Sequence, residues 1–330
     1  MIHDIDLLSL GFRIRLITDS HDAVRYFQNT GERQIPAYSW CEARRRIHPH
    51  ATITYLDVPL QEVAIDPDGN TAFIATSWNT LFESDLEFLA LMMFNRLYLQ
   101  RGWTCANSVG LKKGDSGILL LGEYGSGKSI VGLSLTKHGY KLISGDRTVV
   151  GTTINSTPYI LGGTVPLRLR AGTIQKFFPE LIQCLPTTLK SYDDFWEKQF
   201  TIHTSSQRFV IQQNAKAPLK SLFFVRVMPS TESEESYRSL GRPFDRIRLY
   251  LALSYYILGH GIVFMGVGKP LPSVDNVSFA KSRIDLAKKM LESAHCFEIK
   301  GNLNFVLDRI VTLAEGGLEE DRQLPEDKKS

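Results

Sequence analysis

The sequence predicts an α/β protein in which a mixed sheet with flanking helices follows a small α+β region. Two observations carry this prediction. A glycine-rich segment, GEYGSGKS at residues 122–129, stands between an apolar run typical of a strand and a periodic run typical of a helix. Strand and helix patterns then alternate, and hydrophobic residues make up 43% of the 330, enough for a large core.

The segment at residues 122–129, called the glycine-rich loop below, satisfies the P-loop pattern G-x-x-x-x-G-K-[ST]. Glycines let successive backbone N–H groups turn inward around phosphates, and the following helix offers its positive end to the same anion. Lys128 is expected to reach the β- and γ-phosphates, and the Ser129 hydroxyl to coordinate Mg²⁺. The predicted nucleotide-binding residues are Gly122, Glu123, Tyr124, Gly125, Ser126, Gly127, Lys128, Ser129 and Ile130.

Asp146 is the acid expected to complete this site. It follows the short apolar strand predicted at residues 141–144, at the edge where α/β sheets collect ligands. An aspartate there can bind Mg²⁺ or take the proton from an attacking hydroxyl. The alternative is an ordinary turn aspartate after Gly145.

Residues 1–102 are expected to form the small α+β region. Residues 12–17 and 51–56 alternate side chains as half-buried strands do, and the turn sequence at 66–70 predicts a hairpin. Ser84 and Glu87 have the spacing of a capping box, which predicts the start of an amphipathic helix. The apolar residues that recur along this helix are Leu86, Leu89, Met93 and Leu97, and it is expected to end near Gly102.

Residues 103–318 are expected to form the nucleotide-binding domain, and residues 319–330 a disordered, charged tail. The predicted strands cover residues 117–121, 141–144 and 222–227, and the predicted helices 129–138, 244–258, 280–293 and 303–314. Residues 228–242 are polar and predict a surface loop.

Composition disfavours several other classes of protein. The 38 basic and 35 acidic residues leave a net charge of +3, too small and dispersed to predict a nucleic-acid partner. The four cysteines lie far apart, which favours reduced thiols. The amino terminus lacks the features of a signal peptide, and no stretch reaches the roughly 18 apolar residues of a membrane span. We therefore expect a cytoplasmic protein that binds neither nucleic acid nor membranes.

The order of these elements resembles a known family. Strand, glycine-rich loop, short helix, Gly139-Tyr140 and a strand ending at Asp146 are similar to the carboxyl-terminal domain of HPr kinase/phosphorylase and its relatives, which include the kinases of lasso-peptide gene clusters. The segments VPLRLR at 165–170 and CFEI at 296–299 agree with the likeness, of which only the loop is specific. The resemblance implies a phosphoenolpyruvate-carboxykinase-like fold, ATP and Mg²⁺ as cofactors, and a homo-oligomer.

The resemblance also implies roles for single residues. Lys128 and the loop would hold the phosphates, Asp146 would act as base on the acceptor hydroxyl, and Arg170 would steady charge on the transferring group. The sequence departs from the family at three places. Gly145 replaces the first acid of an Asp-Asp pair, Arg168 replaces a glutamate, and residues 105–108 lack the usual histidine.

Three readings of the function follow. The first is an ATP- and Mg²⁺-dependent kinase that phosphorylates a hydroxyl, favoured to be a serine of a peptide or protein. The second is a small-molecule kinase similar to shikimate kinase, although such proteins begin at the loop and are about half this length. The third is a nucleotide-binding regulatory or assembly protein without phosphotransfer, which the missing acid and histidine leave open.

Overall fold

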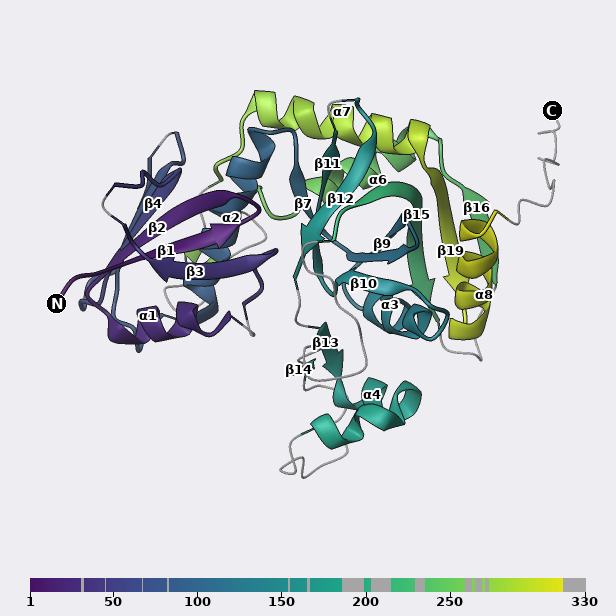
Figure 1. The fold of residues 1–330 in the computed structure, drawn as a ribbon, viewed down its shortest axis with the longest axis horizontal. Coiled ribbons are helices and arrows are strands. Elements are labelled where there is room, and N and C mark those ends of the chain that lie inside the picture. Colours follow the sequence, from purple (N-terminus) through teal and green to yellow (C-terminus); the bar gives the residue numbers. More distant parts are fainter. Residues whose placement is uncertain are drawn as a thin grey trace.

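A computed structural model describes most of the chain. The described residues are 1–30, 33–44, 46–66, 68–81, 83–153, 155–164, 167–185, 199–202, 215–228, 235–258, 263–264, 269–270 and 273–316. They form two large sheets and seven α-helices, so the predicted α/β class is confirmed. Figure 1 shows the first sheet beside the second, with helix α2 (Glu83–Leu99) between them. The tail predicted at 319–330 lies outside the described residues.

The first sheet has six strands in the order β3-β1-β2-β4-β6-β5. They are β1 (His3–Ser9), β2 (Phe12–Thr18), β3 (Tyr38–Glu42), β4 (Ala51–Leu56), β5 (Glu62–Ile65) and β6 (Thr71–Ala75). Both strands predicted from alternation, β2 and β4, are present, and buried residues alternate with partly exposed ones along them. β5 and β6 pair antiparallel, which confirms the predicted hairpin. The β2–β4 and β4–β6 pairs are parallel, so this sheet is mixed.

Helix α2 differs from the prediction because it is buried on all sides instead of being amphipathic. Its charged residue Arg96 is buried along with the apolar ones, and Met92 and Met93 are fully buried core residues. The capping box is wrong as well. The Glu87 carboxylate accepts hydrogen bonds from the Tyr26 hydroxyl, at 2.7 Å, and from the backbone N–H of Gln34. Partners from elsewhere in the fold therefore replace the local cap.

The second sheet contains nine strands and carries the glycine-rich loop. Seven follow the order β10-β8-β9-β15-β12-β11-β7, while β19 pairs with β15 and β16 with β19. They are β7 (Thr104–Asn107), β8 (Val109–Lys113), β9 (Ser116–Leu121), β10 (Lys141–Ser144), β11 (Arg147–Thr152), β12 (Pro158–Gly163), β15 (Ala217–Val227), β16 (Ser236–Ser239) and β19 (His295–Gly301). β9, β15 and β19 run parallel, so their carboxyl ends meet at one edge of the sheet.

Helices cover both faces of this second sheet. They are α3 (Lys128–Thr136), α6 (Pro243–Ser254), α7 (Val277–Ser293) and α8 (Leu303–Ala314). Leu120 and Phe223 pack in one core with α3 and α8, whereas Leu119 and Leu222 pack in another with α6 and α7. Alternate residues of β9 and β15 are thus buried on opposite faces, which explains why these strands are continuous apolar runs.

The other elements are short. They are α1 (His21–Gln28), β13 (Leu167–Arg170), α4 (Ala171–Phe177), the 3₁₀ helix η2 (Pro179–Cys184), β14 (Gln199–Ile202), β17 (Val263–Phe264) and β18 (Lys269–Pro270). Strand β16 lies inside the segment predicted as a loop at residues 228–242, because its backbone pairs with β19 despite its polar sequence. Among the described residues, no helix combines the length and apolarity needed to cross a membrane.

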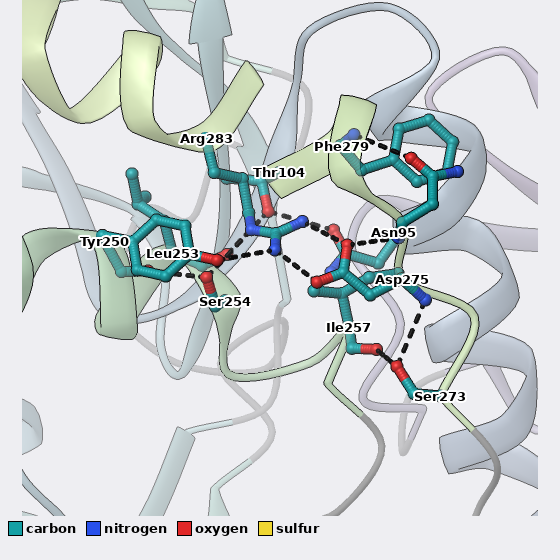
Figure 2. Close-up of polar contacts among 11 residues, drawn as sticks. Asn95, Thr104, Tyr250, Leu253, Ser254, Ile257, Ser273, Asp275, Phe279 and Arg283 are labelled. Carbon is teal, nitrogen blue, oxygen red and sulfur yellow. Dashed lines mark hydrogen bonds and ion pairs between the residues drawn. The ribbon is translucent and has the colours of Figure 1, made fainter. Parts of the chain in front are cut away.

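A buried polar network joins helices α2, α6 and α7 (Figure 2). The guanidinium of Arg283, on α7, donates to both carboxylate oxygens of Asp275, at 2.9 and 2.6 Å, and to Ser254 Oγ at 2.9 Å. Its side chain is completely buried. Beside it, Thr104 Oγ1 lies 3.3 Å from Asn95 Oδ1 of α2. A charge this deep is tolerated only while its partner is present.

Candidate functional site

The glycine-rich loop lies at the carboxyl edge of the second sheet, where it joins β9 to α3. Gly122, Gly125 and Gly127 have φ angles of +153°, +79° and +93°, a region that L side chains avoid. These three conformations turn the chain sharply between Leu121 and the first turn of α3. The glycine spacing noted in the sequence therefore has a conformational cause.

Two of these glycines also allow a close approach to the end of β15. A Cβ atom on Gly122 would lie 2.7 Å from the carbonyl oxygen of Val225, and one on Gly127 would lie 2.6 Å from Val227 Cγ2. The Val227 N–H in turn donates to the Ser126 carbonyl oxygen at 2.8 Å. The loop is thus held against β15 at a distance that only glycine permits.

Lys128 is the first residue of α3, and its side chain crosses the loop. Its Nζ donates to the carbonyl oxygens of Gly122, at 2.8 Å, and Glu123, at 3.0 Å. Burial lowers the pKa of Lys128, while the charges of Asp146 and Glu123 oppose this fall. Within the described part of the chain the ammonium has no ion-pair partner. It is therefore a cation held over the loop by two backbone carbonyl oxygens.

The other loop residues fit a polar ligand. The Ser126 hydroxyl is buried and has no hydrogen-bond partner among the described residues. No side chain caps the amino end of α3, so the positive end of the helix is open to an anion. Tyr124 is 75% exposed at the loop tip, whereas Ile130 packs partly against the core beneath α3.

The donors for a metal ion are few. Ser129 is half-buried in the first turn of α3, and its hydroxyl and the Asp146 carboxylate are oxygen donors of the type that Mg²⁺ prefers. The described residues contain no group of three His, Cys, Asp or Glu side chains that could hold a metal. The donor set therefore fits Mg²⁺ that shares its coordination with phosphate oxygens and water.

Asp146 stands in the turn between β10 and β11, beside the loop. Its carbonyl oxygen accepts a hydrogen bond from the Ser108 N–H at 2.9 Å, which ties this turn to the start of β8. The carboxylate is 32% exposed and lies 3.7 Å from Arg147 Nε. Its charge opposes the fall in the pKa of Lys128, while no hydrogen bond or ion pair joins the two side chains within the described residues.

Arg147, next to Asp146, was not identified in the sequence as a site residue. It is buried, and its Nη1 donates to the carbonyl oxygen of Gln34, just before β3. Its Nε lies 3.3 Å from the Tyr256 hydroxyl, and its guanidinium carbon lies 5.1 Å from the centre of the Phe88 ring. Arg147 therefore fastens the turn that carries Asp146 to the amino-terminal part of the fold.

The structure does not join Arg170 to the loop by any contact among the described residues. On β13, Leu167 and Leu169 pack in the core with α3, while Arg168 and Arg170 are exposed on the other face. Burial raises the pKa of Glu87, and Arg168 is among the cations that oppose this rise.

A groove of ≈ 580 Å³ lies beside the loop, between it, the ends of β15 and β19, and helix α6. Its lining residues are Gly122, Glu123, Tyr124, Gly125, Ser126, Phe224, Val225, Arg226, Val227, Met228, Phe244, Arg248, Glu298 and Lys300. Apart from the loop, none of these was predicted as a site residue. One signal was available, since Arg226 interrupts the apolar run at residues 222–227 near the end of its strand.

No protein-family model matches the chain, and no match to a curated protein was found. The resemblance to HPr kinase/phosphorylase stays a prediction.

Proposed function

We propose that the protein is an ATP- and Mg²⁺-dependent kinase that transfers the γ-phosphoryl group to a hydroxyl, with a serine of a peptide or protein as the favoured acceptor. The observation that carries this proposal is the glycine-rich loop, which the Lys128 side chain crosses at the uncapped amino end of α3. The proposal includes an HPr-kinase-like form of the α/β fold, related to phosphoenolpyruvate carboxykinase, in a cytoplasmic protein.

The surroundings of the loop residues, Ser129 and Asp146 support a role for each of them in phosphoryl transfer. The backbone N–H groups of the loop and of the first turn of α3 would bind the phosphates, and Lys128 would exchange carbonyl oxygens for phosphate oxygens. Ser129 and Asp146 would hold Mg²⁺, which neutralises phosphate charge when bound. The Asp146 carboxylate would take the proton from the acceptor hydroxyl. The hydroxyl oxygen of the acceptor would then bond to the γ-phosphorus as the bond from this phosphorus to ADP breaks and ADP leaves. Arg170 has no described contact that supports its predicted role.

A nucleotide-binding regulatory or assembly protein that transfers no phosphate is the second candidate. Gly145 favours it, because this buried position before Asp146 offers no second carboxylate. The third candidate is a kinase that phosphorylates a small-molecule hydroxyl. It differs from the first candidate only in the kind of molecule that the acceptor site binds.

The proposal is tested with γ-labelled ATP and Mg²⁺. Wild type is expected to bind Mg·ATP and to label an acceptor in an extract of its own source. Lys128→Ala should weaken Mg·ATP binding by about 10- to 100-fold, because hydrogen bonds to charged groups contribute about 1.5–3 kcal/mol. Calorimetric titration measures the binding. Unchanged affinity in this variant would refute the phosphate site, and binding without any labelled acceptor would favour the second candidate.

Nucleotide affinity is also expected to depend on pH through Lys128. Burial lowers the pKa of this ammonium in the free protein, whereas bound phosphates favour its charged form. Affinity should therefore be constant at low pH and fall as pH rises, with the fall beginning below the ordinary lysine pKa of 10.5. Mg·ADP titrations across pH measure this. Lys128→Arg, which stays charged, should lose the alkaline fall, and an equal fall in that variant would exclude Lys128 as its source.

A further inference from the structure

The floor of the groove carries two adjacent cations. Arg226 on β15 is in register with Lys300 on β19, just as Phe224 is with Glu298. Neighbouring strands lie about 4.8 Å apart, so the two cationic side chains leave the sheet side by side. Both line the groove, on the same face as Arg248 of α6. Like charges at paired positions repel each other, and a bound anion would relieve that repulsion.

The carboxylate of Glu298, which lies between these cations and Arg248 in the groove lining, neutralises the pair only in part. Glu298 accepts hydrogen bonds from Arg238 Nε and Arg248 Nη1, each at 2.8 Å. Lys300 Nζ lies 3.9 Å from the same carboxylate, which is too long for a hydrogen bond. For Arg226 no ion pair is found within the described ranges. Glu298 is thus shared by two arginines and Lys300, so this one carboxylate balances only part of the charge of these cations and of Arg226.

We propose that Arg226 and Lys300 form an anion-binding subsite for the phosphate acceptor, which is an acidic peptide segment with a carboxylate close to its reacting hydroxyl. This inference rests on the proposed function and names the substrate class for it. The exposed ring of Phe244 and the side chain of Met228 add an apolar rim, and the volume of the groove suits several peptide side chains.

The two cations of the subsite, Arg226 and Lys300, are not among the residues that would hold the nucleotide phosphates. The groove borders the loop at residues 122–126 and extends toward β15 and β19, and neither Lys128 nor Ser129 lines it. The loop N–H groups, the end of α3 and Lys128 already match a phosphate chain. The two further cations therefore serve a second anion.

The test uses the full chain with its loop saturated by Mg·ADP, and a capped acidic peptide, Glu-Glu-Ser-Glu-Glu, as the probe. The double variant Arg226→Gln, Lys300→Gln should bind the peptide at least about tenfold more weakly than wild type, because charge-assisted contacts are lost. Its affinity for Mg·ADP should stay within about threefold. Lys220→Gln, which removes an exposed charge on the same strand outside the groove, is the matched control and should change neither.

Three results would contradict the anion-binding subsite. If the double variant loses Mg·ADP affinity as much as peptide affinity, the cations serve the nucleotide phosphates and the proposal is overturned. Peptide binding that is equal in wild type and double variant, or equal for the neutral peptide Gln-Gln-Ser-Gln-Gln, also overturns it. If wild type binds no Mg·ADP, the proposed function fails, and the same peptide titration without nucleotide still tests the subsite. Far-ultraviolet circular dichroism checks that the variants are folded.

Discussion

Asp146→Asn is expected to slow phosphoryl transfer by about 10²- to 10⁴-fold, and to weaken Mg·ATP binding by much less, because the amide oxygen can still contact Mg²⁺. The amide keeps the size of the carboxylate but cannot accept the proton of the acceptor hydroxyl. Arg147, which holds the turn, keeps its hydrogen bonds to the Gln34 carbonyl and the Tyr256 hydroxyl, so the position of the backbone should be retained. The measurement compares initial rates of label transfer with binding constants from titration.

The matched control for this change is Asp115→Asn. Asp115 is exposed in the turn between β8 and β9, away from the loop. The Asp115→Asn variant loses the same charge as Asp146→Asn and should transfer phosphate at the wild-type rate. Wild-type transfer by the Asp146 variant would remove this residue as the base, and a parallel loss in both variants would point to overall charge instead.

Asp275→Ala is expected to lower the free energy of unfolding by about 3–5 kcal/mol, because it leaves the buried guanidinium of Arg283 without its counter-charge. The Asp275 carboxylate accepts two of the hydrogen bonds that Arg283 donates. Among the described residues, the other acceptors of the Arg283 guanidinium are the hydroxyls of Ser254 and Tyr250. Urea unfolding followed by circular dichroism measures the change.

Two further variants separate charge burial from loss of a side chain. Asp285→Ala removes an exposed acid from α7, the helix that carries Arg283, and should lower the free energy of unfolding by less than about 0.5 kcal/mol. The double variant Asp275→Leu, Arg283→Met should recover much of the loss, since apolar replacement of both members of a buried pair is often neutral. A single Asp275 variant as stable as wild type would mean that the guanidinium finds other partners or water.

Much of the site could be predicted because its signals are local. The loop and Lys128 lie within eight consecutive residues, and the conformations of Gly122 and Gly127 follow from contacts with the strand beside them. Strands β4 and β10 and helix α8 have the predicted bounds, because alternation and helical periodicity reflect burial on one face. Asp146 follows strand β10 as predicted, and its role at the loop stays a prediction.

The features that were missed depend on contacts between distant segments. Glu87 reads as part of a local cap, but its partners come from Tyr26 and Gln34, far earlier in the chain. Arg226 and Lys300 become neighbours only when strand β19 pairs with β15, and the sequence around either residue does not predict that register. Single-sequence patterns describe neighbours along the chain, so they could not supply these pairs.

The two sheets are not joined merely by a linker, because they share a continuous apolar interior. The core cluster that fills the first sheet also contains Cys105, Val149, Leu161 and Tyr256 from the second part of the fold. Cutting the chain near residue 102 would leave complementary surfaces on both fragments, each exposing side chains that the other normally covers. The amino-terminal third therefore helps to stabilise the part of the fold that carries the glycine-rich loop, and the whole chain should unfold in one cooperative transition.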